Sequence, residues 1–94
     1  MANVKVIFTG VWLLWLGPSL ASIEADNLGE AMAIVNMKIK HALIKKLKIM
    51  HSSSKGKIEN YSYILVNDTV PHEGLKTKLE AGDTIKLIPK IVGG

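Results

Sequence analysis

The 94-residue sequence contains no cysteine, and this absence excludes several kinds of chemistry. No disulfide can stabilise the fold, and a zinc site with cysteine ligands cannot form. No side chain can carry a persulfide, a thioester or a nucleophilic thiolate. If the protein takes part in sulfur or acyl chemistry, another group must carry the sulfur or the acyl bond.

Arginine is also absent, and all twelve basic residues are lysine. Together with eight acidic residues they give a formal net charge of +4. Bidentate contacts to guanine and phosphate depend mainly on arginine, so specific recognition of nucleic acid is not expected. The basic balance can still attract nucleic acid or an acidic partner surface without sequence specificity.

The sequence has none of the common catalytic motifs: no phosphate loop, dinucleotide fingerprint, metalloprotease helix or serine elbow. His41, His51 and His72 fall in a predicted helix, a loop and a turn, without the spacing of metal ligands. We therefore expect no metal site, no bound cofactor and no enzyme activity of its own.

The apolar stretch of residues 6–16 allows two interpretations. Lys5 precedes it and small residues follow it, as in a signal peptide, although it is short for a membrane-spanning helix. Alternatively, residues 4–8 form a buried first strand, and residues 11–16 form an apolar turn or short helix. The rest of the sequence favours the second interpretation and a cytoplasmic protein.

Residue periodicity predicts the order of the remaining elements. Residues 19–25 are partly β-like, and Asn27 with Glu30 resembles the capping box of a long amphipathic helix. Residues 61–66 are rich in aromatic and branched side chains and predict a central strand. After turns at residues 67–68 and 80–83, residues 84–88 form the last strand. This order predicts an α+β fold with one sheet packed against one main helix.

Gly93 and Gly94 follow the last strand closely and end the sequence. Glycine lacks a Cβ, so such a tail can pass through a narrow channel and bring its carboxylate to a nucleotide in another protein. Once activated as an acyl-adenylate, the carboxylate can react with sulfur or with an amine. A frayed, inert end is the competing interpretation.

Three stretches resemble the MoaD/ThiS family of ubiquitin-like sulfur carriers, most closely its MoaD branch. Residues 81–94 match the family's final signature, in which a Gly-Asp turn, an apolar strand and a proline lead to Gly-Gly. Residues 64–67 match a strand that ends in Val-Asn, and residues 4–8 match the opening strand more loosely. Two features depart from the family: Asp68 replaces the usual glycine, and residues 11–16 are apolar where charge is common.

The resemblance implies a ubiquitin-like β-grasp domain over residues 1–90, with a flexible tail at residues 91–94. Its sheet would be mixed, with four to five strands and one main helix packed across a face. In the family, an activating enzyme uses ATP to adenylate the last glycine, and a sulfur donor then forms a thiocarboxylate. Carried over, Gly94 is the reactive residue. The residues that enter the partner would be Gly93, Val92, Ile91 and Pro89.

The resemblance also implies the partners: the adenylating enzyme and a larger subunit of the molybdopterin synthase kind. Two other functions are compatible with the same tail. The chain could be a protein modifier joined to lysines through Gly94, or a β-grasp binding module that does no chemistry. Carriers that deliver sulfur to pterin, thiamine or tRNA acceptors share this kind of tail, so the sequence leaves all three acceptors open. Residues 11–16 either cover the sheet edge or contact a partner.

Overall fold

The computed structural model describes residues 2–49 and 57–90 of the chain. Within these residues, four strands, two α-helices and two short 3-10 helices (η1 and η2) follow one another. In order they are β1 (Ala2–Phe8), α1 (Gly10–Leu16), β2 (Ser19–Ala25), α2 (Leu28–Ile49), η1 (Ile58–Tyr61), β3 (Ser62–Val66), η2 (Gly74–Lys76) and β4 (Thr84–Pro89).

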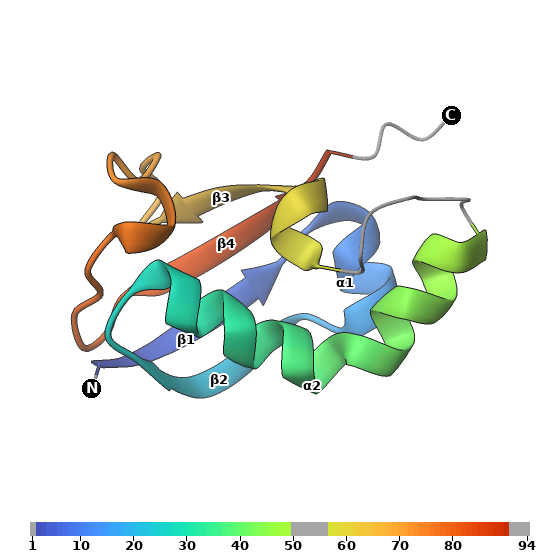
Figure 1. Ribbon diagram of the computed structural model, residues 1–94, viewed down its shortest axis with the longest axis horizontal. Helices are drawn as coiled ribbons and strands as arrows, with labels where there is room; N and C mark the ends of the chain where they lie inside the picture. Colours follow the sequence, from blue (N-terminus) through green and yellow to red (C-terminus); the bar gives the residue numbers. More distant parts are fainter. Residues whose placement is uncertain (1, 50–56, 91–94) are drawn as a thin grey trace.

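The four strands form one mixed sheet in the order β2-β1-β4-β3. The first strand, β1, is antiparallel to β2 and parallel to β4, and β4 is antiparallel to β3. The long helix α2 crosses one face of this sheet (Figure 1). The predicted architecture, a mixed sheet with one main helix across a face, is confirmed.

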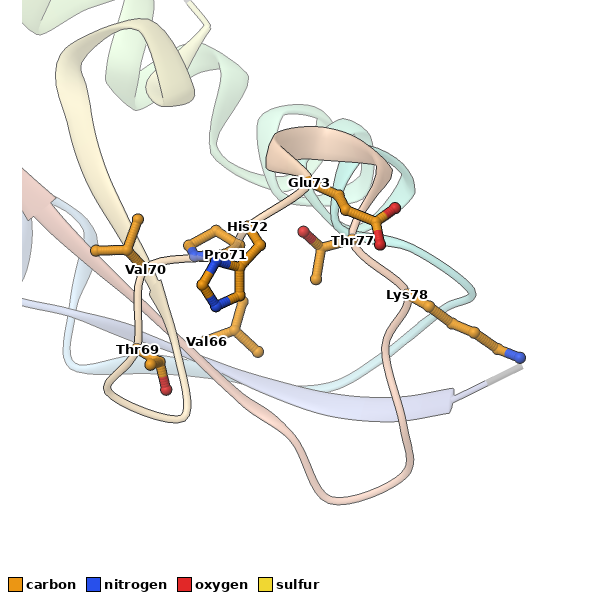
Figure 2. A pocket seen from close by; sticks show the side chains of 8 residues that line it. All are labelled: Val66, Thr69, Val70, Pro71, His72, Glu73, Thr77 and Lys78. Atoms are coloured by element: carbon orange, nitrogen blue, oxygen red, sulfur yellow. The ribbon is translucent and has the colours of Figure 1, made fainter.

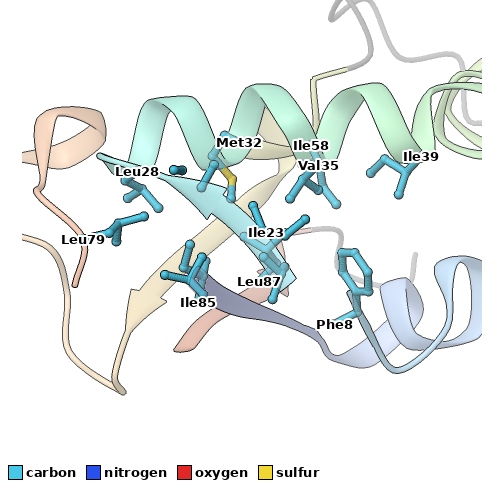
Figure 3. Packing of buried hydrophobic residues seen from close by; sticks show 14 of the residues in the cluster. Phe8, Ile23, Leu28, Met32, Val35, Ile39, Ile58, Leu79, Ile85 and Leu87 are labelled. Atoms are coloured by element: carbon cyan, nitrogen blue, oxygen red, sulfur yellow. The ribbon is translucent and has the colours of Figure 1, made fainter. Parts of the chain in front are cut away.

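The core lies between α2 and the sheet, and alternating residues of each strand point into it. Val4, Val6 and Phe8 of β1 are buried, whereas Asn3 and Lys5 between them are exposed. Figure 3 shows the α2 side chains that face these strands, which are Leu28, Met32, Val35 and Ile39. Full burial of each such side chain contributes about 1.5–3 kcal/mol.

The predicted capping box at the start of α2 is present with one change. The Asn27 side-chain Oδ1 accepts a hydrogen bond from the backbone N–H of Glu30 at 2.9 Å. In return, Glu30 Oε1 accepts from the backbone N–H of Asp26 at 2.8 Å, one residue earlier than the usual pattern. The first contact satisfies a donor that a helix start leaves unpaired, and the second pairs the N–H of the residue before the cap.

The prediction of a central strand at residues 61–66 is wrong in its position. Tyr61 belongs to η1, and β3 is an edge strand. Only alternate residues face the core: Ile64 and Val66 pack against it, whereas Tyr63 is 60% exposed. The aromatic and branched side chains of β3 are therefore divided between the core and the opposite face of the sheet.

Residues 11–16 form the short helix α1, as one interpretation of this stretch predicts. Trp12 is fully buried, and its indole N–H donates a 2.9 Å hydrogen bond to Ser62 Oγ. The Ser62 hydroxyl then donates to the backbone oxygen of Ile58 at 2.7 Å. This buried chain of hydrogen bonds joins α1 to η1 and β3. Among the described helices, none is long and apolar enough to cross a membrane.

We expect Ser62→Ala to lower the free energy of unfolding by about 1–3 kcal/mol. The change removes the partner of the Trp12 indole N–H and of the Ile58 carbonyl while both stay buried. Thr69→Val is the control, because it removes a hydroxyl whose hydrogen bond is exposed, and we expect it to change stability by less than about 0.5 kcal/mol. Urea denaturation measures both. Equal effects would show that the buried contact contributes nothing.

Candidate functional site

The structure reaches the base of the predicted site. Pro89 is the last residue of β4, and Lys90 follows it. The other four predicted site residues, Ile91, Val92, Gly93 and Gly94, lie outside the described residues. Their roles stay predictions. The described structure shows how the chain is held just before them.

The strand that leads to the tail is held on both sides. Its residues 84–87 pair with residues 5–8 of β1, and its residues 85–89 pair with β3. Ile85 and Leu87 are fully buried. The tail therefore follows a central strand that contributes two residues to the core.

Asn67 and Asp83 fix the beginning of β4. The Asn67 side chain accepts a hydrogen bond from the backbone N–H of Thr84 and donates one to Asp83 Oδ1, both at 2.9 Å. The other Asp83 oxygen accepts from the backbone N–H of Glu80 at 2.8 Å. These contacts join the end of β3 to the turn that begins β4.

The Asn67-Asp68 turn tolerates the departure from glycine. Both residues have positive φ, 51° and 65°, a conformation that Asn and Asp adopt more readily than other residues with a Cβ. The Asp68 carboxylate also lies 2.8 Å from Lys86 Nζ of β4. This ion pair lies at the surface and contributes little to stability, and the turn conformation allows it to form.

The end of β4 is held by contacts from three elements. The backbone N–H of Lys90 donates to the Tyr61 carbonyl at 2.7 Å, and Lys90 Nζ lies 5.3 Å from the centre of the Tyr63 ring. On the other side, the backbone N–H and the hydroxyl of Thr9 both donate to the Leu87 carbonyl, at 3.2 and 3.0 Å. The direction in which the chain leaves the sheet is therefore fixed up to Lys90.

Gly10, the first residue of α1, allows a close approach to Pro89. It has a φ of 56°, and a Cβ at this position would lie 2.9 Å from Pro89 Cγ. Glycine is the residue that accepts this backbone conformation without strain and leaves room for the proline ring. The start of α1 is thus in direct contact with the last residue of β4.

An apolar strip lies on the sheet face opposite α2, and sequence reasoning missed it. Tyr63 of β3 pairs with Ile88 of β4, next to Pro89, and both point away from the core. Leu65 and Ile7 flank Lys86 on the same face. The signal was available in the alternation of β3, because the residues between Ser62, Ile64 and Val66 must face the other side.

A hollow of about 380 Å³ lies away from this site. Its lining includes Val66, Val70, His72 and Lys78 (Figure 2). Val66 pairs with Ile85, at the opposite end of β4 from Pro89. Within the described residues, no three His, Asp or Glu side chains are grouped so that they could hold a metal ion.

Three solved structures are similar to this one over nearly their whole length. Small archaeal modifier protein 1 from Methanosarcina acetivorans has a TM-score of 0.73 and 25% identity, covering 100% of this chain and 98% of that chain. A chain in the complex of subunits 1 and 2 of molybdopterin-converting factor from Helicobacter pylori gives a TM-score of 0.58 and 27% identity, covering 97% of this chain and 97% of that chain. CysO from Mycobacterium tuberculosis gives 0.63 and 27%, covering 95% of this chain and 100% of that chain.

These neighbours are ubiquitin-like proteins of the MoaD/ThiS sulfur-carrier type, so the resemblance and the β-grasp fold inferred from the sequence are confirmed. They are small carrier and modifier proteins, and this chain shares their fold. No family model matches the sequence, and comparison with curated proteins finds no significant match.

Gly10→Ala tests the contact that positions the end of β4. Gly74 has almost the same φ, 57°, but an added Cβ there would meet nothing within 4 Å. We therefore expect Gly74→Ala to cost about 1–2 kcal/mol of backbone strain, and Gly10→Ala to cost about 1–3 kcal/mol more from the clash. Urea denaturation of both variants measures the difference, and equal losses would contradict the close approach to Pro89.

Proposed function

We propose that this chain, which has the fold of the MoaD/ThiS-type carriers, is itself a sulfur carrier that works through the carboxylate of Gly94. The observation that carries the proposal is the arrangement at the end of β4. A central strand, held by β1, β3 and Thr9, ends at Pro89, and Lys90, Ile91, Val92, Gly93 and Gly94 follow it in the sequence.

The chemistry follows from the groups available. A carboxylate oxygen of Gly94 attacks the α-phosphorus of ATP in an activating enzyme, and pyrophosphate leaves. Hydrosulfide (HS⁻) supplied by a sulfur donor then attacks the acyl carbon, AMP leaves with the bonding electrons, and the resulting thioacid loses its proton. The product is a thiocarboxylate. A chain without cysteine can hold sulfur in this way, because the sulfur is bound to the main-chain terminus.

Molybdopterin assembly is the acceptor pathway we propose. The support is the similarity to a chain in the complex of subunits 1 and 2 of molybdopterin-converting factor. The partner would then be a larger synthase subunit whose channel takes Gly93, Val92 and Ile91. The apolar strip at Tyr63 and Ile88 lies beside Pro89 and would lie against the mouth of that channel. An ATP-dependent step of this kind fits a cytoplasmic protein.

A protein modifier is the second candidate. Small archaeal modifier protein 1 is similar over the full length of this chain, at a TM-score of 0.73. The same acyl-adenylate would be attacked by the ε-amine of a lysine instead of by sulfur, which gives an amide bond. The two candidates therefore share the first step and differ in the nucleophile of the second.

Intact mass spectrometry tests the carrier proposal. The protein is incubated with ATP, a sulfur donor and the activating enzyme from the same cells, and its mass is followed. We expect an adenylate adduct, then the exchange of one oxygen for one sulfur at the C-terminus. A variant that lacks Gly94 should keep its fold and show neither product. If the wild-type mass does not change while the enzyme activates a known carrier, the proposal is wrong.

Cell lysate probed for the chain separates the two candidates. A modifier gives heavier species that depend on ATP and on Gly94, whereas a carrier that only donates sulfur gives a single free band. We expect the free band to dominate. Abundant conjugates that disappear on deletion of Gly94 would favour the modifier instead.

A further inference from the structure

The short helix α1 presents two leucines to solvent. Trp12 points into the core, but Leu13 is 45% exposed and Leu14 is 82% exposed. We call Leu13 and Leu14 together the leucine surface. An exposed pair of large apolar side chains on a helix of seven residues has no role in the core.

The leucine surface lies close to the place where the chain leaves the sheet. Gly10 of α1 is in contact with Pro89, and Thr9 donates two hydrogen bonds to the Leu87 carbonyl. Trp12 is bonded to Ser62, which pairs with Pro89. A protein that receives the tail at Lys90 would therefore meet α1 as well.

The same end of the molecule is strongly basic. Figure 1 shows α1, the C-terminal part of α2, and the end of β4 together at the end opposite the N-terminus. This end, with η1 and the residue before it, carries seven lysines and one acidic residue, Glu59. The lysines are Lys38, Lys40, Lys45, Lys46, Lys48, Lys57 and Lys90.

The rest of the described chain has the opposite balance, with seven acidic residues and four lysines. The acidic residues are Glu24, Asp26, Glu30, Asp68, Glu73, Glu80 and Asp83. The charge is therefore separated along the molecule, and the basic end is the one at which β4 ends. Charge separation of this kind orients a protein as it approaches an oppositely charged partner.

We infer that the leucine surface docks into an apolar depression with an acidic rim on the activating enzyme, beside the channel that receives the tail. This inference rests on the proposed function, because the activating enzyme is the protein that must reach Gly94 first. The lysines steer the basic end toward the acidic rim, and Leu14 is then buried. This inference accounts for the apolar residues on both faces of α1. Trp12 packs in the core, and Leu14 contacts the partner.

A protein surface fits these features better than a nucleic acid or a membrane. The leucines need an apolar counterpart, which a phosphate backbone does not offer, and the basic end has no arginine. A membrane would accept the leucines, but two side chains on seven residues bury little apolar area compared with an interfacial helix. A second copy of the chain is also a poorer fit, because only its acidic end would attract the basic end of the first copy.

The test is ATP–pyrophosphate exchange by the activating enzyme as a function of carrier concentration. Leu14→Asp should raise KM for the carrier about tenfold or more and leave kcat nearly unchanged, because docking precedes chemistry. Val70→Asp is the matched control: Val70 is 69% exposed near the opposite end of β4, and the charge change is the same. We expect it to behave as wild type.

A pair of charge reversals tests the steering. Lys38→Glu with Lys40→Glu changes two exposed lysines at the basic end, and Lys76→Glu with Lys78→Glu changes two exposed lysines at the other end with the same spacing. The first double variant should raise KM at least several-fold and weaken its dependence on salt. The second should change KM by less than about twofold.

The possible outcomes separate the two proposals. If wild type supports exchange and Leu14→Asp has the same KM, the docking surface is wrong and the carrier function stands. If wild type supports no exchange with a competent enzyme, the carrier function is wrong and the docking partner is wrong with it. Unchanged KM together with loss of binding to phosphatidylserine vesicles, or loss of self-association in sedimentation, would assign the leucine surface to a membrane or to a second copy instead.

Discussion

The pairing of β4 between β1 and β3 is the constraint on which the rest of this structure depends. A central strand satisfies its backbone hydrogen bonds on both sides and buries alternate side chains, here Ile85 and Leu87. The reactive end that we propose is attached directly to this strand. Contacts with Thr9, Tyr61 and Gly10 hold the chain in place up to Lys90.

Sequence reasoning succeeded where a local pattern has one physical solution. The alternation at residues 4–8 can bury only one set of side chains, and Asn27 with Glu30 has few uses other than to start a helix. It failed for β3, because composition shows that a strand is apolar but not which neighbours it has. The contacts of Trp12 with Ser62 and of Gly10 with Pro89 span about 50 and 80 residues of sequence and were not predictable, since they depend on sheet order.

Helix α1 connects the core to the surface beside the end of β4. Its inward residue, Trp12, joins a buried hydrogen-bond chain that reaches β3, and its first residue touches the end of β4. A change of structure at α1 would therefore alter the end of β4 as well as the core. This arrangement gives a physical reason why an apolar segment can replace charged residues at this position without being buried completely.

The parallel pairing of β1 with β4 also determines how late the centre of the sheet can form during synthesis. Residues 5–8 are synthesised about 80 residues before their partners at residues 84–87. Contacts between such distant segments form late, because a long loop must close before they give any stabilisation. The centre of the sheet therefore cannot assemble until residues 84–87 have been made, however early β1 and β2 are able to pair.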